Sequence, residues 1–68
     1  MKSNEVIDLI SVRAIEIAGG SSNDWERLCW MAVHEYHHGA LPTEYDIREI
    51  DEDLYLAVLN RLKQINKN

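Results

Sequence analysis

The sequence has one cysteine, one proline, three glycines and no phenylalanine among its 68 residues. Because Cys29 is alone, no disulfide can form within the chain, which argues against a secreted, disulfide-held fold and favours a reducing compartment such as the cytoplasm. No apolar run approaches the roughly 18 residues of a membrane-spanning helix, and charged residues interrupt the first 20 positions. We therefore expect a cytoplasmic protein with neither a signal peptide nor a membrane anchor.

Positive charge is also scarce, since seven lysines and arginines face 12 aspartates and glutamates, for a formal net charge of -5. Such a chain repels a phosphate backbone, so we expect no direct nucleic-acid binding and a protein partner with a basic surface. The sequence has no glycine-rich phosphate loop, no cysteine-based zinc knuckle and no serine or cysteine nucleophile with a plausible triad. These absences predict that the protein is not an enzyme.

Glycine-containing breaks at residues 19–23 and 39–42 divide the chain into three segments. We predict helices over residues 3–18 and 23–38 and a third from about residue 51, where acidic residues lead into an apolar pattern. Ser3 or Asn4 can cap the first helix, Ser22 or Asn23 can cap the second, and Gly39 can end it. Residues 43–50 permit a short helix or a strand, and a helical turn is favoured because a strand would have no partner. The expected fold is all-α, a single domain over residues 1–68 forming a small antiparallel three-helix bundle, with an optional extra short helix at 43–50.

Apolar periodicity predicts the faces that form the core. In the first helix, apolar residues lie almost all round the cylinder, so this helix is either central in the fold or covered on its second side by another chain. A thin core is expected, because a domain this short buries only about 60% of its unfolded surface. The predicted core residues are Val6, Ile7, Ile10, Ala14, Ile17, Trp25, Leu28, Cys29, Ala32, Tyr36, Leu54, Val58, Leu62 and Ile65.

The string His34-Glu35-Tyr36-His37-His38 satisfies the H-E-x-x-H pattern, in which two histidines four residues apart hold zinc and the glutamate polarises the attacking water. Here the chain resembles the metzincin zinc peptidases, whose third ligand lies six residues after the second histidine, a position held by Glu44. The resemblance implies a zinc ion bound by His34, His38 and Glu44, with Glu35 as the base. It covers 11 residues, and Leu41 stands where the family has its turn glycine.

The helical wheel places His34 and His38 on the side of the second helix opposite Trp25. We therefore expect both rings to face solvent, since a three-helix bundle has no spare element to enclose a catalytic metal there. Solvated histidines near a helix C-terminus are the preferred interpretation. Metal bridging between subunits by His34, His37 or His38 is an alternative.

The outward side of the second helix, with Arg27, Trp30, Met31 and His34, is a predicted partner-binding surface, because a large aromatic residue beside methionine is a common interface anchor. The alternative is that the first helix or segment 40–50 covers Trp30. A second predicted surface is the acidic segment 43–53, which contains one base, Arg48. It could dock on a basic groove or be a solvated helix start. Its acids are Glu44, Asp46, Glu49, Asp51, Glu52 and Asp53.

The leading hypothesis is a small acidic helical interaction module that binds and regulates or inhibits a larger, basic-surfaced protein, including one that handles nucleic acid. In size and style the chain resembles short accessory proteins of phages and mobile elements. Two alternatives stay open. One is a zinc-binding protein or metal-dependent hydrolase that uses the histidine string, and the other is a structural homo-oligomer. The leading hypothesis includes self-association, as a homodimer formed through the first or second helix.

Overall fold

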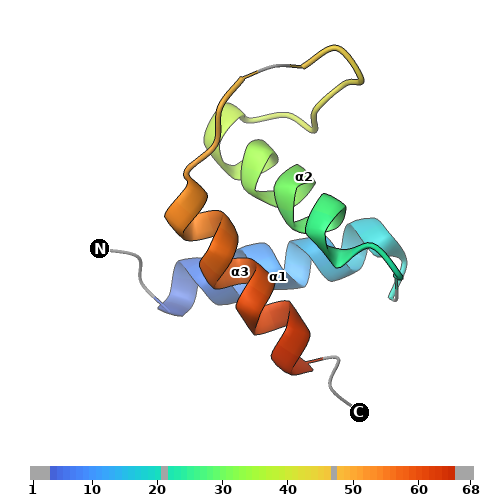
Figure 1. The fold of residues 1–68 in the computed structure, drawn as a ribbon, viewed down its shortest axis with the longest axis vertical. Coiled ribbons are helices and arrows are strands. Elements are labelled where there is room, and N and C mark those ends of the chain that lie inside the picture. Colours follow the sequence, from blue (N-terminus) through green and yellow to red (C-terminus); the bar gives the residue numbers. More distant parts are fainter. Residues whose placement is uncertain (1–3, 21, 47, 66–68) are drawn as a thin grey trace.

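The computed structural model describes residues 4–20, 22–46 and 48–65, and these form three helices and no strand. The helices are α1 (Asn4–Ala18), α2 (Trp25–His38) and α3 (Glu52–Ile65), and each contacts the other two. In Figure 1, α2 and α3 run side by side in opposite directions, and α1 crosses behind them. The predicted all-α three-helix bundle is therefore confirmed. Within the described chain, no helix has the length and apolar character needed to cross a membrane.

Glycines end the first two helices at the predicted breaks. Gly19 and Gly20 have φ of 70° and 107°, and their N–H groups donate to Glu16 O and Ile15 O at 3.1 and 3.0 Å. This pair of bonds is a Schellman motif, whose left-handed backbone favours glycine. Gly39, with φ of 79°, ends α2 by a single bond to Glu35 O at 2.9 Å. The two breaks in the sequence therefore fix where these helices stop.

Aspartates begin the second and third helices. The carboxylate of Asp24 accepts from Arg27 N at 3.2 Å, so the N-cap of α2 lies one or two residues after the predicted Ser22 or Asn23. Ser22 instead accepts from Asp24 N, which orients that cap. Asp51 caps α3 by accepting from Leu54 N at 3.2 Å, at the predicted start. For α1, Asn4 is the first helical residue, and Ser3 lies outside the described residues.

The core lies where the three helices meet, and most of it follows the predicted faces. Tyr36 and Ile65 were predicted to be buried, but each is 48% exposed. The buried apolar residues of α2 are instead Cys29, Ala32 and Val33, and His34 is buried where the connection to α3 covers the helix. The buried apolar residues are Ile10, Ala14, Cys29, Ala32, Val33, Leu54, Val58, Leu59 and Leu62.

The α2–α3 connection, residues 39–51, arches over the C-terminal end of α2 (Figure 1). Its described residues contain a turn, closed by Asp46 N donating to Thr43 O at 3.1 Å, and no helix. The optional short helix at 43–50 is thus absent from the described part of that range, which leaves out residue 47. The Asp46 side chain bonds that of Arg48, two residues on, and a helix would not let side chains at this spacing face each other.

Candidate functional site

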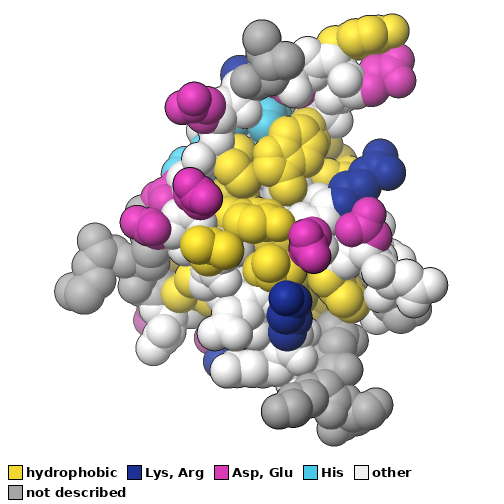
Figure 2. Space-filling view, in the orientation of Figure 1, with side chains coloured by type: hydrophobic (Ala, Val, Ile, Leu, Met, Phe, Trp, Pro, Cys, Tyr) yellow, Lys and Arg dark blue, Asp and Glu magenta, His cyan; other side chains and the backbone are white. Residues whose placement is uncertain are grey.

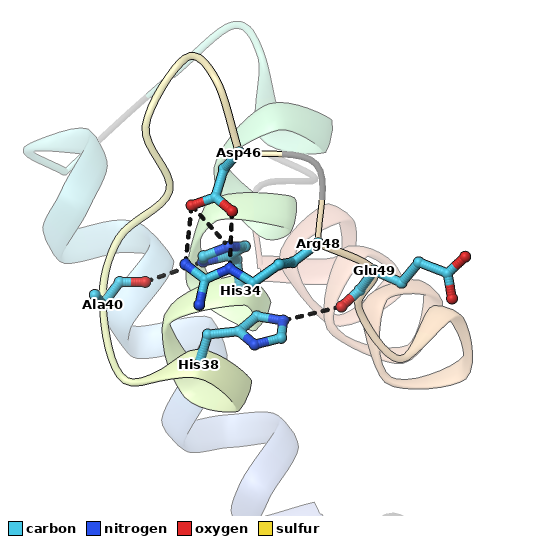
Figure 3. Close-up of polar contacts among 6 residues, drawn as sticks. All are labelled: His34, His38, Ala40, Asp46, Arg48 and Glu49. Atoms are coloured by element: carbon cyan, nitrogen blue, oxygen red, sulfur yellow. Dashed lines mark hydrogen bonds and ion pairs between the residues drawn. The ribbon is translucent and has the colours of Figure 1, made fainter.

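His34 is 0% exposed, so the prediction that its ring faces solvent is wrong. The α2–α3 connection folds over this side of α2 and encloses the ring (Figure 3). His34 Nδ1 lies 3.0 Å from Ala40 O, and Nε2 lies 3.3 Å from Asp46 Oδ2. The helical wheel missed this placement because it describes α2 alone and contains no information about the connection. His34 therefore cannot contact a partner in this structure.

The two nitrogens of His34 have different surroundings. Because a backbone carbonyl only accepts, Nδ1 carries a proton and donates it to Ala40 O. Nε2 is within ion-pair distance of the Asp46 carboxylate but lacks the alignment of a hydrogen bond. The ring thus lies between two acceptors, both supplied by the connection.

Asp46 joins this buried ring to Arg48. The guanidinium of Arg48 donates to both carboxylate oxygens, at 2.8 and 3.0 Å, and the Asp46 side chain is 11% exposed. The pKa of Asp46 is lowered, chiefly by the Arg48 hydrogen bonds and further by His34 and the Thr43 backbone, against the opposing effect of desolvation. Asp46, predicted to be a partner-binding acid, is therefore used within the fold.

His38 fixes the far end of the connection. Its Nε2 donates to Glu49 O at 2.9 Å, and its ring centroid lies 4.6 Å from that of His34 (Figure 3). On the preceding turn of α2, the Trp30 ring centroid lies 5.6 Å from that of His34. Trp30, His34 and His38 therefore form a row along α2, on which the connection rests.

The residues that the metzincin resemblance assigns to zinc do not form a complete ligand set, although the rings of His34 and His38 lie close together. Glu35 lies toward α1, where Arg13 donates to its two oxygens at 2.7 and 3.0 Å and lowers the pKa of the carboxyl. Glu44 is exposed, and one nitrogen of each candidate histidine is bonded to a backbone carbonyl. Among the described residues, no group of three or more histidine, cysteine, aspartate or glutamate side chains is placed to hold a metal ion.

A groove of about 450 Å³ lies beside Trp30, between α2, the end of the connection and the start of α3. Trp30 is half-buried there, so segment 40–50 covers it in part and leaves the rest of the ring accessible. Figure 2 shows hydrophobic side chains gathered over α2 and α3, with acidic side chains on both sides of them. We call this the Trp30 groove, lined by Trp30, Arg48, Glu49, Ile50, Glu52 and Tyr55.

The surroundings of the Trp30 groove are acidic. The pKa of Tyr55 is raised, first by burial and further by the negative charges of Glu26 and Asp24. The Arg48 charge is paired with Asp46, which leaves Glu49 and Glu52 as the carboxylates that line the groove. An aromatic floor beside carboxylates that form no ion pair with the described residues suits a cationic side chain.

The other residues of the predicted partner surface fall in several places. Of that set, the groove brings together Trp30, Glu49 and Glu52. Three others are exposed but do not line the groove: Arg27, Glu44 and Asp53. Met31 is half-buried, and Asp51 caps α3. Sequence reasoning missed Ile50 and Tyr55, because their position beside Trp30 depends on how α3 packs against α2. A helical wheel of the third helix would place Tyr55 next to the core face, and this was the available signal.

Residues 5–66 match a protein family described as "Domain of unknown function (DUF8662)". The chain belongs to this family. The match spans all three helices of this member of DUF8662 and the connection that encloses His34. No curated protein and no solved structure matches the chain.

Proposed function

We propose that the protein is a small acidic interaction module, which binds a basic segment of a larger protein in the Trp30 groove and thereby regulates or inhibits that protein. The observation that carries the proposal is the groove itself, where Trp30 and Tyr55 lie beside the carboxylates of Glu49 and Glu52. A lysine or arginine side chain over the Trp30 ring gains a cation–π interaction, and nearby carboxylates strengthen its binding.

The rigidity of the groove wall supports this proposal. Arg48, Glu49 and Ile50 come from a connection that His34 and His38 bond through backbone carbonyls, so the wall is held in place before a partner arrives. A preorganised site binds more tightly because less conformational entropy is lost on association.

We propose binding in preference to catalysis, because the cysteine and the candidate base of the histidine string are both held within the fold. The Cys29 thiol is buried and donates to Tyr55 O at 3.1 Å, and burial raises its pKa to about 12. The thiolate that would act as nucleophile is thus scarce at neutral pH. The Glu35 carboxylate, the candidate base, is held by Arg13.

The test is calorimetric titration of the protein with a flexible peptide rich in lysine and arginine, and with the same peptide carrying glutamine at those positions. We expect the basic peptide to bind and the glutamine peptide to bind at least tenfold more weakly. Trp30→Ala should cost about 2 kcal/mol of binding free energy, as removal of an interface anchor does. Binding should weaken as salt is added.

A matched pair of variants separates the groove from general acidity. Glu49→Gln with Glu52→Gln removes the two lining carboxylates, whereas Glu44→Gln with Asp53→Asn removes two exposed acids outside the lining. Both pairs change the net charge equally, so only the first should abolish most of the binding. Equal losses in the two pairs, or equal binding of the two peptides, would contradict the proposal.

A further inference from the structure

A second groove, of about 270 Å³, lies between α1 and α2 and shares no lining residue with the Trp30 groove. Leu9 and Val12 of α1 are 62% and 56% exposed there, and Tyr36 of α2 adds an exposed ring. Ile10 and Ala32 form its floor. We call this surface the α1/α2 face. It is the second apolar side of α1, which the other helices leave uncovered.

The edge of the α1/α2 face carries charges of both signs. Arg13 Nε lies 2.7 Å from Glu35 Oε1, and Arg13 Nη1 lies 3.9 Å from Glu16 Oε1. All three residues line the groove. In a two-fold arrangement the same patch meets itself, so an arginine of one copy can approach a glutamate of the other in both directions. The edge can therefore form reciprocal ion pairs with a second copy of itself.

The distribution of charge over the chain favours the same occupant. Segment 43–53 holds six acids and one base, a local charge of -5, and the rest of the chain holds six acids and six bases. Two copies that met through the Trp30 groove would bring these acidic segments together and repel each other. Two copies that met through the α1/α2 face would join surfaces from the electrically balanced part of the chain.

We propose that the α1/α2 face docks on the same face of a second copy of this chain, forming a two-fold dimer. Leu9, Val12 and Tyr36 are buried at its centre, and Arg13 with Glu16 forms its polar edge. The dimer leaves both Trp30 grooves open, so this inference is independent of the function proposed for them.

Sedimentation equilibrium of the untagged chain over a range of concentrations tests the dimer. We expect a mass of twice the 7.9 kDa monomer at high concentration. Leu9→Asp and Val12→Asp should each weaken dimerisation at least tenfold, because each places a charge in an apolar contact. Leu56→Asp is the matched control, since Leu56 is 53% exposed on α3 and lies outside the α1/α2 face.

Several outcomes would overturn the dimer: a monomer at every concentration, a closed assembly larger than two, or dimerisation lost in Leu56→Asp and kept in the α1 variants. Far-ultraviolet circular dichroism shows whether each variant folds. If an aspartate variant unfolds, the milder Leu9→Gln and Val12→Thr changes replace it, with the same expected direction. Basic-peptide binding, measured in the same variants, should stay unchanged, which distinguishes failure of the dimer from failure of the Trp30 groove.

Discussion

His34 and Glu35 are adjacent in the sequence, and the structure uses them on different sides of α2. His34 points under the α2–α3 connection, where it is fully enclosed and bonds Ala40 O. Glu35 points toward α1, where it forms an ion pair with Arg13 that stays partly accessible to water. The comparison shows that a string matching a catalytic motif can consist of residues with separate structural tasks, one holding a loop and the other joining two helices.

The two sides should also differ in how much they stabilise the fold. Replacing a buried side chain removes its packing and hydrogen bonds, and its former partners are left without water to bond. An exposed ion pair contributes less, because solvent screens it and water can bond either partner when the other is removed. Replacements at His34, Asp46 and Glu35 should therefore have effects that decrease in that order.

The largest loss of stability is expected for His34→Ala. Loss of the buried ring leaves a cavity and an unpaired Ala40 carbonyl, and should lower the free energy of unfolding by about 2–4 kcal/mol. Urea denaturation followed by circular dichroism measures this free energy of unfolding. His37→Ala is the control, because His37 is exposed on the same turn and should change stability by no more than about 0.5 kcal/mol.

If His34→Ala is too unstable to fold, His34→Gln keeps an amide donor for Ala40 O and gives a measurable intermediate loss. Equal stability of the His34 and His37 variants would show that the connection does not need the buried ring.

A smaller, pH-dependent effect is expected for Asp46→Asn. The pKa of Asp46 in the folded protein lies below its unfolded value of about 3.9, so its contribution is complete above that value and is lost as the pH falls toward the folded pKa. The asparagine variant should therefore be less stable than the wild type at neutral pH and should show a flatter stability curve in acid. Denaturation midpoints at a series of pH values from neutral to strongly acidic provide the measurement, and parallel curves would contradict the role of Asp46.

The smallest effect is expected for Glu35→Gln, on the α1 side. The variant loses a charge-assisted pair with Arg13, but solvent screens that pair, so the destabilisation should be less than in Asp46→Asn. Added salt should reduce it further. Denaturation of wild type and variant at low and high salt gives the comparison, and a loss as large as that of His34→Ala would reverse the proposed ranking of the two sides.

The elements of the fold could be predicted because their signals are local. Helix ends at Gly19 and Gly39 follow from the left-handed backbone that glycine adopts, and the core positions of α3 follow from its apolar spacing. The buried state of His34 could not be predicted in this way. It depends on a connection whose path is fixed by contacts six to 12 residues away, such as Ala40 O and Asp46, and no helical period encodes them.

The groove was predictable only in part for the same reason. Trp30 was identified as a large aromatic residue on the outward side of the second helix, and Glu49 and Glu52 from the density of acids around them. Their convergence with Tyr55 requires the packing of α3 on α2, which is a property of the assembled chain. Tyr36 failed as a core prediction because it lines the open groove between α1 and α2, whereas the buried apolar residues of α2 are Cys29, Ala32 and Val33.

The two histidines attach the connection through main-chain oxygens, of Ala40 and Glu49, which every amino acid possesses. Substitutions at positions 40 and 49 therefore keep the hydrogen bonds that hold the connection. At position 49 the backbone is anchored while its side chain faces the groove. A change of side chain at position 49 would thus alter the lining of the groove while the hydrogen bond that anchors this position stays in place.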